Sequence, residues 1–442
     1  GTVQDWQPLS NATVGNGTNN VNGIQLDKDY TCTHFYLAED LSLTVTERRI
    51  TTETSGGNVC LLLNKDITKS TGTRAIMVMA GSTLNLMGNG TVQGLGTYAS
   101  SLFMGSALDV RGTINLFGGN YTNHSTRVNY PVVTLISATA RVNMYEGTSI
   151  YPTGTYTNHN GSVVKFQANS QVFNMYGGSI SGGNVHVSST NTGRGGNVQC
   201  TKNATFNMYG GTVSGGSAAN YGGNMYFSAG TLNIYGGSIY GGSAGADTGV
   251  NENGGNIYVT GATLNIEGGN IYNGSAGVYG GNIYANNATS MTISGGKIGV
   301  AADGTVSGGT AGTNGGNLYL AGTTAAVVSG DAVITGGSVT AGNGGNISVG
   351  GSASLTLNGT DAEHPVISNG TANNEDEDTD AMGGNIYVAG TLTMNHGELL
   401  GGYAEDGGSV AVFGGTATIS GGVVDGTADY TNTSDDGGLF FL

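Results

Sequence analysis

One phrase returns along most of the chain, and it limits the folds that the chain can adopt. In its fullest form it reads G-G-N-I-Y-V, a turn, T-L-N-I-Y-G-G, and then S-I-Y-G-G-S-A. Repetition with a period of about two dozen residues plus a loop is typical of solenoid proteins. Copies begin at Gly195, Gly222, Gly254, Gly280, Gly315, Gly344, Gly383 and, in a variant form, Gly407.

Each copy contains three short segments that alternate in polarity and are separated by glycine pairs. In Leu232-Asn233-Ile234-Tyr235, Leu and Ile would face one side of a strand, and Asn and Tyr the other. One unit has too little apolar surface to fold alone, but stacked units share a continuous core. Parallel crossovers are right-handed as a general rule. We therefore predict an all-β chain, a single-stranded right-handed parallel β-helix with three strands per coil and roughly twelve coils.

Weaker copies extend the series toward the N-terminus and suggest three regions. Residues 1–58 are expected to form an entry or cap region of irregular β structure, and residues 59–194 less regular coils. Residues 195–442 are expected to form regular GGN coils that are open at the C-terminal edge. Loop length varies mainly before the next GGN phrase, as at 243–253, 301–314 and 361–382, which predicts that insertions lie at one corner of the coil.

Composition excludes the other classes of glycine-rich chain. The sequence has 83 Gly but only 4 Pro and no period of three, so it is not collagen. With 22 Tyr and regularly spaced aliphatic residues, it is not a disordered chain. Three cysteines are too few for a disulfide framework, and whether Cys32 pairs with Cys60 is left open.

Charge is distributed very unevenly. Residues 1–297 hold all 13 basic and 13 acidic residues, whereas residues 298–442 hold 16 acidic residues and no base. An acidic surface repels nucleic acid and anionic membranes, so we expect neither as a partner. No apolar run is long enough for membrane insertion. Basic proteins, cations and neutral glycans remain as candidate partners.

The N-terminal segments resemble those of a known group of proteins. Phe35-Tyr36-Leu37-Ala38-Glu39-Asp40-Leu41 and Asn58-Val59-Cys60-Leu61-Leu62-Leu63-Asn64 are similar to the opening of large proteins of Gram-positive gut anaerobes. In those proteins the opening leads into Gly-rich, pectate-lyase-like β-helix repeats. The resemblance implies a secreted or surface-anchored chain, often one module of a longer protein, but no single activity. Lys65-Asp66 departs from the family, which usually has Gly after the Asn.

The residues required for carbohydrate cleavage are not found in the expected patterns. Lyases of this fold need a basic residue near acidic Ca²⁺ ligands, and no Lys or Arg follows Lys297. The hydrolases of this architecture use Gly-His-Gly and Arg-x-Lys tripeptides, and neither occurs here. The six His residues are scattered without metal or triad spacing. We assign no catalytic residue, and fold alone does not license an activity.

Outward columns of repeated side chains are the most specific candidate for binding. We predict ligand binding by the column Tyr226, Tyr258, Tyr284, Tyr319 and Tyr387, because exposed aromatic rings stack on sugars or bury a partner's surface. A second aromatic column contains Tyr145, Tyr176, Tyr209 and Tyr235. An Asn ladder runs through Asn85, Asn115, Asn143, Asn174, Asn207, Asn233 and Asn265. The alternative is that the rings and amides only stabilise the coils.

An acidic run occupies one of the long loops. Carboxylate oxygens are the ligands that calcium prefers, so this run could chelate Ca²⁺, the one cofactor that the sequence suggests. The alternative is a solvated charge run that keeps the chain soluble. The residues concerned are Glu375, Asp376, Glu377, Asp378 and Asp380.

The last residues read as the start of a further GGN strand. Gly437 and Gly438 are followed by Leu439, Phe440, Phe441 and Leu442, which we predict to form an assembly edge. An open apolar strand edge invites pairing, so the segment is either the cut edge of a longer protein or a docking strand for a second copy. Head-to-tail contacts that do not close on themselves generate filaments.

The sequence therefore supports three hypotheses in order. The first is a non-enzymatic extracellular or cell-surface fibre or stalk module with structural or adhesive function, self-associating end to end. The second is a carbohydrate-binding surface protein that uses the outward Tyr and Asn columns. The third is a polysaccharide lyase or hydrolase.

Overall fold

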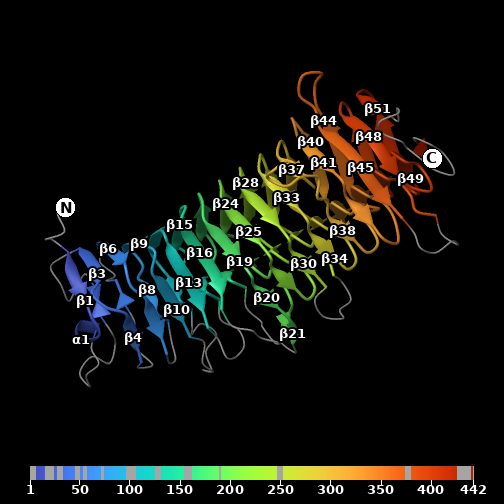
Figure 1. Cartoon of the computed structure of the whole chain (residues 1–442). Coiled ribbons are helices and arrows are strands. Elements are labelled where there is room, and N and C mark those ends of the chain that lie inside the picture. Colours follow the sequence, from blue (N-terminus) through green and yellow to red (C-terminus); the bar gives the residue numbers. More distant parts are fainter. Residues whose placement is uncertain are drawn as a thin grey trace. The chain divides into compact units, whose positions relative to one another are not determined.

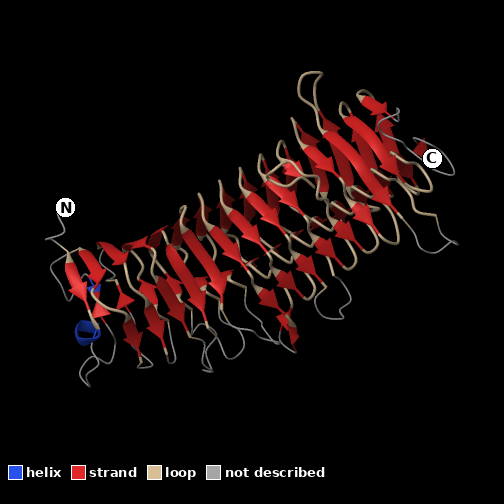
Figure 2. Ribbon diagram, in the orientation of Figure 1, coloured by secondary structure: helices blue, strands red, loops and turns tan. Residues whose placement is uncertain are grey.

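The computed structural model describes residues 6–14, 24–26, 33–44, 50–52, 57–70, 74–95, 106–124, 131–153, 162–188, 191–245, 252–373, 380–425 and 440–441. These residues form a right-handed parallel β-solenoid of about 12 turns, with three strands per turn and essentially no helix. Short strands dominate Figure 2, and a short helix, α1 (Asn11–Val14), lies near the N-terminus. The predicted fold class is confirmed.

Two compact units make up the chain. The N-terminal unit contains residues 1–191 and 197–212, and the C-terminal unit contains residues 192–196 and 213–442. In Figure 1 the first runs from blue to green and the second from green to red. Each unit contributes strands to three ladders, which we call sheets I, II and III. Two further short strands, β21 (Val187–Ser188) and β22 (Asn191–Thr192), lie outside them.

Sheet I is formed by the T-L-N-I segments of the repeat. In the N-terminal unit its neighbouring strands are β1 (Gln7–Leu9), β3 (His34–Leu37), β6 (Asn58–Leu63), β9 (Thr83–Gly88), β12 (Thr113–Phe117), β15 (Arg141–Met144), β18 (Val172–Met175) and β24 (Thr205–Met208). In the C-terminal unit they are β28 (Thr231–Ile234), β32 (Thr263–Ile266), β36 (Ser290–Ile293), β40 (Ala325–Ser329), β44 (Ser354–Asn358), β47 (Thr391–Met394) and β50 (Thr416–Ile419).

Sheet II is formed by the segments that follow each GGN. In the N-terminal unit its strands are β2 (Ile24–Gln25), β5 (Ile50–Thr51), β8 (Ile76–Val78), β11 (Leu108–Val110), β14 (Val133–Leu135), β17 (Val164–Phe166) and β23 (Val198–Cys200). In the C-terminal unit they are β27 (Met225–Phe227), β31 (Ile257–Thr260), β35 (Ile283–Asn286), β39 (Leu318–Ala321), β43 (Ile347–Val349), β46 (Ile386–Val388), β49 (Val410–Val412) and β52 (Phe440–Phe441).

Sheet III closes each turn, and in most of the C-terminal unit it splits into two parallel arms. Its N-terminal strands are β4 (Leu41–Leu43), β7 (Ile67–Lys69), β10 (Thr91–Gly94), β13 (Gly119–Asn123), β16 (Thr148–Pro152), β19 (Ser179–Ser181) and β20 (Asn184–Val185). The first arm contains β25 (Thr212–Ser214), β29 (Ser238–Tyr240), β33 (Asn270–Tyr272), β37 (Lys297–Ile298) and β41 (Val333–Thr335). The second contains β26 (Ser217–Ala218), β30 (Ser243–Ala244), β34 (Ser275–Ala276), β38 (Thr310–Ala311) and β42 (Ser338–Val339). Both arms pair with β45 (Val366–Ala372), which β48 (Glu398–Tyr403) and β51 (Val423–Asp425) follow.

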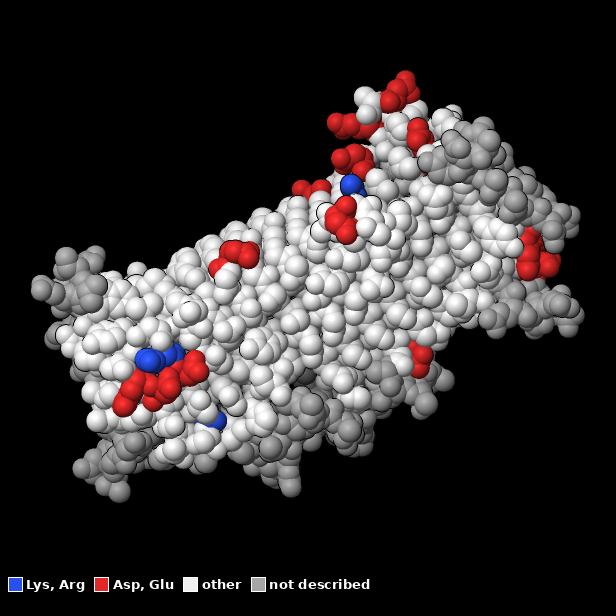
Figure 3. All heavy atoms as spheres, viewed as in Figure 1, with Lys and Arg blue, Asp and Glu red and all other residues white. Residues whose placement is uncertain are grey.

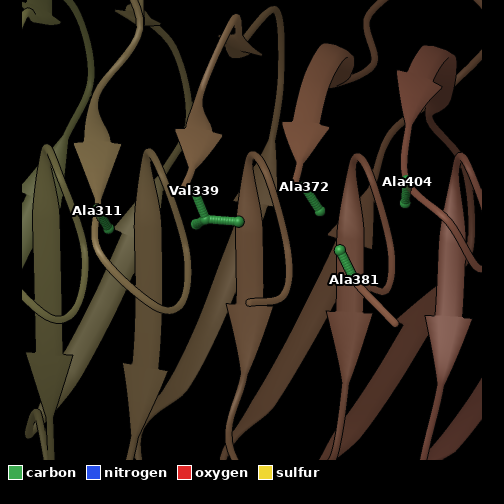
Figure 4. Packing of buried hydrophobic residues seen from close by; sticks show 5 residues of the cluster. All are labelled: Ala311, Val339, Ala372, Ala381 and Ala404. Atoms are coloured by element: carbon green, nitrogen blue, oxygen red, sulfur yellow. The ribbon is translucent and has the colours of Figure 1, made fainter. Parts of the chain in front are cut away.

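The register places like residues on like residues, as the repeat predicts. Leu232 of β28 pairs with Leu264 of β32, and Ile234 pairs with Ile266. All four side chains are buried in the interior. Small side chains stack in the same way where the second arm of sheet III meets the following segment (Figure 4), and this cluster contains Ala311, Val339, Ala372, Ala381 and Ala404. The shared core that stacking was expected to produce is present.

Two different structural constraints require glycine at the two Gly positions of each GGN phrase. The first adopts the left-handed region, with φ of 64° at Gly222, where a side chain is strained. The second lies against two other turns of the chain. A Cβ on Gly223 would collide with the main-chain nitrogen of Ser243 and the main-chain oxygen of Gly255. The pair therefore forms a tight corner that only glycine can occupy.

The predicted position of the insertions is wrong for 301–314 and only partly right for 361–382, where residues 373–382 do lie between β45 and the GGN phrase at Gly383. Residues 299–307 form a small hairpin, with an antiparallel bridge between Val300 and Val306, and it lies between the two arms of sheet III. The loop 359–365 lies between sheets I and III, ahead of β45. Loop length in the sequence identifies an insertion but not its corner, because the short S-A strand cannot be separated from a turn by pattern alone.

Candidate binding surfaces

The predicted ligand column of tyrosines lies on the outer side of sheet II, but it is not the exposed surface that was expected. Tyr226, Tyr258 and Tyr284 pair in register on β27, β31 and β35, followed by Tyr319 on β39. Their exposed fractions are only 4%, 7% and 9% for the first three. Ser348 interrupts the column between Tyr319 and Tyr387. The expectation of exposure is wrong for these first three residues.

Two further tyrosines cover the column. Tyr221 and Tyr279 each precede a GGN phrase, and their rings lie 4.7 Å from that of Tyr258 and 4.6 Å from that of Tyr319, centroid to centroid. The Arg194 guanidinium adds a cation–π contact, 5.1 Å from the centre of the Tyr226 ring. Burial among these rings raises the pKa of Tyr258 to about 12. The rings therefore form a packed cluster.

The second aromatic column lies on the outer side of sheet I and is exposed. Tyr176 and Tyr209 both have 44% of their surface accessible. Tyr176 is stacked between Tyr145 and Tyr209, at 5.1 and 5.0 Å, and Phe117 continues the stack from Tyr145. Neighbouring rings therefore cover both faces of Tyr145 and Tyr176. A sugar stacks on an aromatic face rather than on its edge, so this geometry favours a stabilising role for the column.

The predicted outer asparagine ladder is formed. In the N-terminal unit each amide donates from Nδ2 to Oδ1 of the preceding asparagine, as from Asn115 to Asn85 at 2.8 Å and from Asn143 to Asn115 at 2.7 Å. In the C-terminal unit Asn265 donates to Asn233 at 2.8 Å, and Thr292 then donates to Asn265. These bonds tie each turn to the next along the axis.

A second asparagine ladder, which the sequence reasoning missed, is fully buried. It consists of the Asn of each GGN phrase, and in the C-terminal unit Nδ2 of one residue donates to Oδ1 of the next at 2.7 to 2.9 Å. Each Oδ1 also accepts a main-chain N–H from a glycine of sheet III, as from Gly242 to Asn256 at 2.9 Å. The members are Asn224, Asn256, Asn282, Asn317, Asn346 and Asn385, all with no exposed surface.

Most of the predicted calcium ligands lie outside the described residues. These are Glu375, Asp376, Glu377 and Asp378, while Asp380 is described and exposed. Within the part of the chain that the structure describes, no three His, Cys, Asp or Glu residues are grouped to hold a metal ion. Calcium binding by this run stays a prediction. Of the cysteines, Cys60 and Cys200 are free, and Cys32 is not among the described residues.

Two histidines that looked unrelated in the sequence lie side by side. The rings of His364 and His396 meet edge to face at 5.4 Å. His364 Nε2 is 3.1 Å from a Glu398 carboxylate oxygen, and His396 Nε2 is 3.4 Å from Asp361. The strand register explains why the two histidines meet: Val366 pairs with Glu398, which sets residue 364 opposite residue 396.

Charged groups on the two units differ, as the sequence indicates. On the face seen in Figure 3, basic and acidic atoms lie together in the N-terminal unit, whereas acidic atoms predominate in the C-terminal unit. Asp109 in the N-terminal unit has only 1% of its surface exposed, and it forms ion pairs with Arg74 and Arg111. Paired in this way, the buried carboxylate is compensated.

Part of the predicted assembly edge can be placed. Phe440 and Phe441 form β52, which pairs in parallel with Val410 and Ala411 of β49, so they do begin a further sheet II strand. Leu439 and Leu442 lie outside the described residues. In the turn before it, Ile419 has 41% of its surface exposed, whereas Met394, its partner in the preceding turn, has none.

Comparisons with protein-family models, with curated proteins and with solved structures found no match to this chain. Among the described residues, none of the helical segments has the length and apolar character needed to cross a membrane.

Proposed function

We propose that this chain is a non-enzymatic structural and adhesive module, a β-helix stalk that acts outside the cell or at its surface. The observation that carries the proposal is the buried asparagine ladder. The amide of Asn256 uses all of its hydrogen-bonding capacity on neighbouring turns: it accepts from Asn224 and Gly242 and donates to Tyr272 and Asn282. A side chain used in this way holds the turns together and is not free for chemistry.

Side chains on the outer surfaces also bond to their counterparts in neighbouring turns. The sheet I asparagines bond along the axis, and the tyrosines of sheets I and II stack on one another. Main-chain ladders thus join neighbouring turns, and amide bonds and ring stacking add to them over parts of the chain. Repeats joined by many nearest-neighbour contacts resist local opening, which suits a part that bears load or holds a binding surface away from its anchor.

End-to-end self-association is the second part of the proposal. Ile419 and Val424 in the last complete turn are partly exposed, Ile419 with 41% of its surface accessible, whereas their partners in the preceding turn, Met394 and Leu399, have no exposed surface. A second copy that added its strands there would bury these side chains and pair the open main-chain edge. A contact of this kind is heterologous and extends into a filament unless it closes.

Residues at the N-terminal end differ from those at the C-terminal end. Leu9 of β1 is fully buried, and Val14 of α1 and Leu26 are buried with it. Among the described residues, Ile419 at the C-terminal end is thus far more exposed than these three apolar residues at the N-terminal end. This asymmetry favours head-to-tail addition over pairing of like ends.

A matched pair of variants tests self-association. Ile419→Lys places a charge on the exposed edge, and Val327→Lys places the same charge on the outer side of β40, where Val327 is 37% exposed. We expect sedimentation velocity and electron microscopy to show filaments or oligomers for the unaltered chain and for Val327→Lys, but monomers for Ile419→Lys. Monomers in all three would remove end-to-end association from the proposal.

The non-enzymatic part has its own test. Incubation of the purified chain with pectate and other acidic polysaccharides, with and without Ca²⁺, should release neither unsaturated products nor reducing ends. Turnover that survives repeated purification and is lost on unfolding the chain would establish the enzyme hypothesis instead.

A further inference from the structure

The aromatic column on the outer side of sheet I brings phenol groups together at the surface of the N-terminal unit. Tyr145, Tyr176 and Tyr209 directly follow the strands β15, β18 and β24. Their rings stack at 5.1 and 5.0 Å, with interplanar angles of 16° and 9°. The column therefore holds three phenols in succession, whereas Phe117, which stacks on Tyr145, carries no hydroxyl group.

The edges of these rings, rather than their faces, are open to solvent. Tyr176 lies between two rings that cover both of its faces, yet 44% of its surface is exposed, as is 44% of Tyr209. One edge of each ring is attached to the main chain through Cβ. The exposed part is therefore the opposite edge, which carries the hydroxyl group and the ring carbons beside it.

Other tyrosines of the chain meet only one of these two conditions. Tyr258 and Tyr284 stack at 4.9 Å, but they are only 7% and 9% exposed, and close packing holds their rings in place. Tyr403 is 46% exposed, but its partner in the preceding turn is Thr371. The sheet I column combines an exposed ring edge with a phenol stacked in the neighbouring turn.

We propose that Tyr145, Tyr176 and Tyr209 form a site of oxidative modification, at which a one-electron oxidant joins neighbouring tyrosines as dityrosine. The oxidant that the reaction requires is of the class of a peroxidase with hydrogen peroxide. The new bond links Tyr176 to Tyr145 or to Tyr209, and so joins one turn of the solenoid covalently to the next. Because it forms within one chain, the inference depends neither on end-to-end association nor on an adhesive function.

The chemistry balances with one peroxide for each link. Each of the two tyrosines loses one electron and its hydroxyl proton and becomes a phenoxyl radical. The radicals combine at a ring carbon beside each C–O bond. Each of these carbons then loses its hydrogen as a proton, and each oxygen takes up a proton, which restores both phenols. The two electrons and two protons removed overall reduce hydrogen peroxide to two waters.

The stack places the reacting carbons near each other and leaves only a small movement to make. Centroid distances of 5.1 and 5.0 Å are longer than a carbon–carbon bond, so two rings must tilt together at their outer edges. Rotation about the Cβ–ring bond of tyrosine has a broad minimum, and exposed side chains move within nanoseconds. Tyr145 and Tyr209 are two turns apart, about 10 Å, so they need Tyr176 as a partner.

The test oxidises the full chain at low concentration with a peroxidase and limiting hydrogen peroxide, followed by unfolding, trypsin digestion and mass spectrometry. Trypsin cleaves after Lys165 and Arg194, and Tyr176 is the only tyrosine between them, so a linked peptide 166–194 identifies Tyr176. Tyr176→Phe keeps the ring but removes the hydroxyl group. Tyr403→Phe removes a similarly exposed phenol elsewhere. Circular dichroism would establish that both variants are folded, and a denaturing gel would separate single chains from linked copies.

We expect single chains of the unaltered protein and of Tyr403→Phe to contain peptide 166–194 joined to 142–165 or to 203–297, two hydrogen atoms lighter than the sum. Fragmentation should place the bond at Tyr145 or Tyr209, and dityrosine fluorescence should accompany it. Tyr176→Phe should lack both linked peptides, and oxidation in urea should abolish the preference for these partners. Addition of oxygen to Tyr176 without coupling, links only between copies, or the same partners in the unfolded chain would overturn the proposal.

Discussion

Replacing Asn256 by alanine should destabilise the turns around it severely, although no apolar residue is lost. Asn256 has no exposed surface, and its amide makes four hydrogen bonds of 2.7 to 2.9 Å. Alanine would leave the N–H of Gly242 and one of the two amide hydrogens of Asn224 without a partner, while the Tyr272 carbonyl and Asn282 Oδ1 would each keep a main-chain donor, Gly241 and Gly274. A buried polar group left unsatisfied costs about 1–3 kcal/mol.

The expected loss is therefore about 2 kcal/mol or more, if each of the two orphaned donors contributes at the low end of that range. In a solenoid this loss first opens the affected turns rather than the whole chain. Hydrogen exchange should consequently show faster exchange in β29, β31 and β33, with a lower urea midpoint for the C-terminal unit. Exchange in the N-terminal unit should change little.

The matched control is Asn233→Ala in the outer ladder. Asn233 accepts from Asn265 at 2.8 Å, but it lies on the outer side of sheet I, where water can replace the lost partner. We expect a loss of only about 0.5–1 kcal/mol. Equal losses at Asn256 and Asn233 would refute the reasoning, because they would mean that the burial of the GGN amide has no energetic consequence.

Three further outcomes are expected. Ile234→Asp should open the turns around β28, because it puts an unpaired charge at a position that is 1% exposed. Tyr235→Ser, at a position that is 38% exposed, should cost about 1 kcal/mol or less in thermal unfolding. Similar losses in stability for the two variants would mean that the inner and outer faces of the strand are reversed. Gly223→Ala should prevent correct folding through its collision with Ser243 and Gly255, while Gly351→Ala, which meets no atom within 4 Å, should be tolerated in the same circular dichroism measurement. The pKa of Tyr258 is raised from 10.0 to about 12, so its contribution to stability is complete below pH 10 and is lost as the pH rises toward 12. Phenolate absorbance should therefore rise together with loss of the strand signal in circular dichroism. Titration of all tyrosines near pH 10 without unfolding would contradict this expectation.

The parts of the fold that could be predicted from the sequence are those set by period and register. Strand alternation separates Leu232 and Ile234 from Asn233, and repetition places each on its counterpart in the next turn. The core and the outer asparagine ladder follow from these two facts alone. The core and this ladder can be predicted without knowing the conformation of the corners or how far long side chains extend.

The burial of the sheet II tyrosines could not be predicted in this way. Alternation correctly assigns Tyr258 to the outer side of its strand, but the ring that covers it belongs to Tyr221, which lies ahead of a GGN phrase and outside any strand. Over part of the chain the position before GGN carries tyrosine in alternate turns, as in Tyr221, Asn253, Tyr279 and Asn314. Because each tyrosine ring reaches into the next turn, tyrosine in alternate turns is enough to cover the column.

The sequence shows the GGN asparagine in every regular repeat, but the pattern does not indicate that its amide is buried. Polarity patterns assign polar residues to the outside, and Asn is usually found there. Here a glycine in the left-handed region reverses the chain just before the asparagine and turns its amide into the corner between sheets II and III. The amide can be buried because each neighbouring GGN turn supplies the same amide, so that the donors and acceptors of one residue match those of the next.

The matching of hydrogen-bond donors and acceptors between turns indicates where a binding site should be sought in a chain of repeated turns. A side chain that recurs in every turn finds its partner in its own copies, as Asn256 and Tyr176 do. A side chain can engage another molecule when its column stops and its next neighbour no longer provides the partner. In a β-solenoid, interruptions of a ladder are therefore better candidates for binding than the ladder itself.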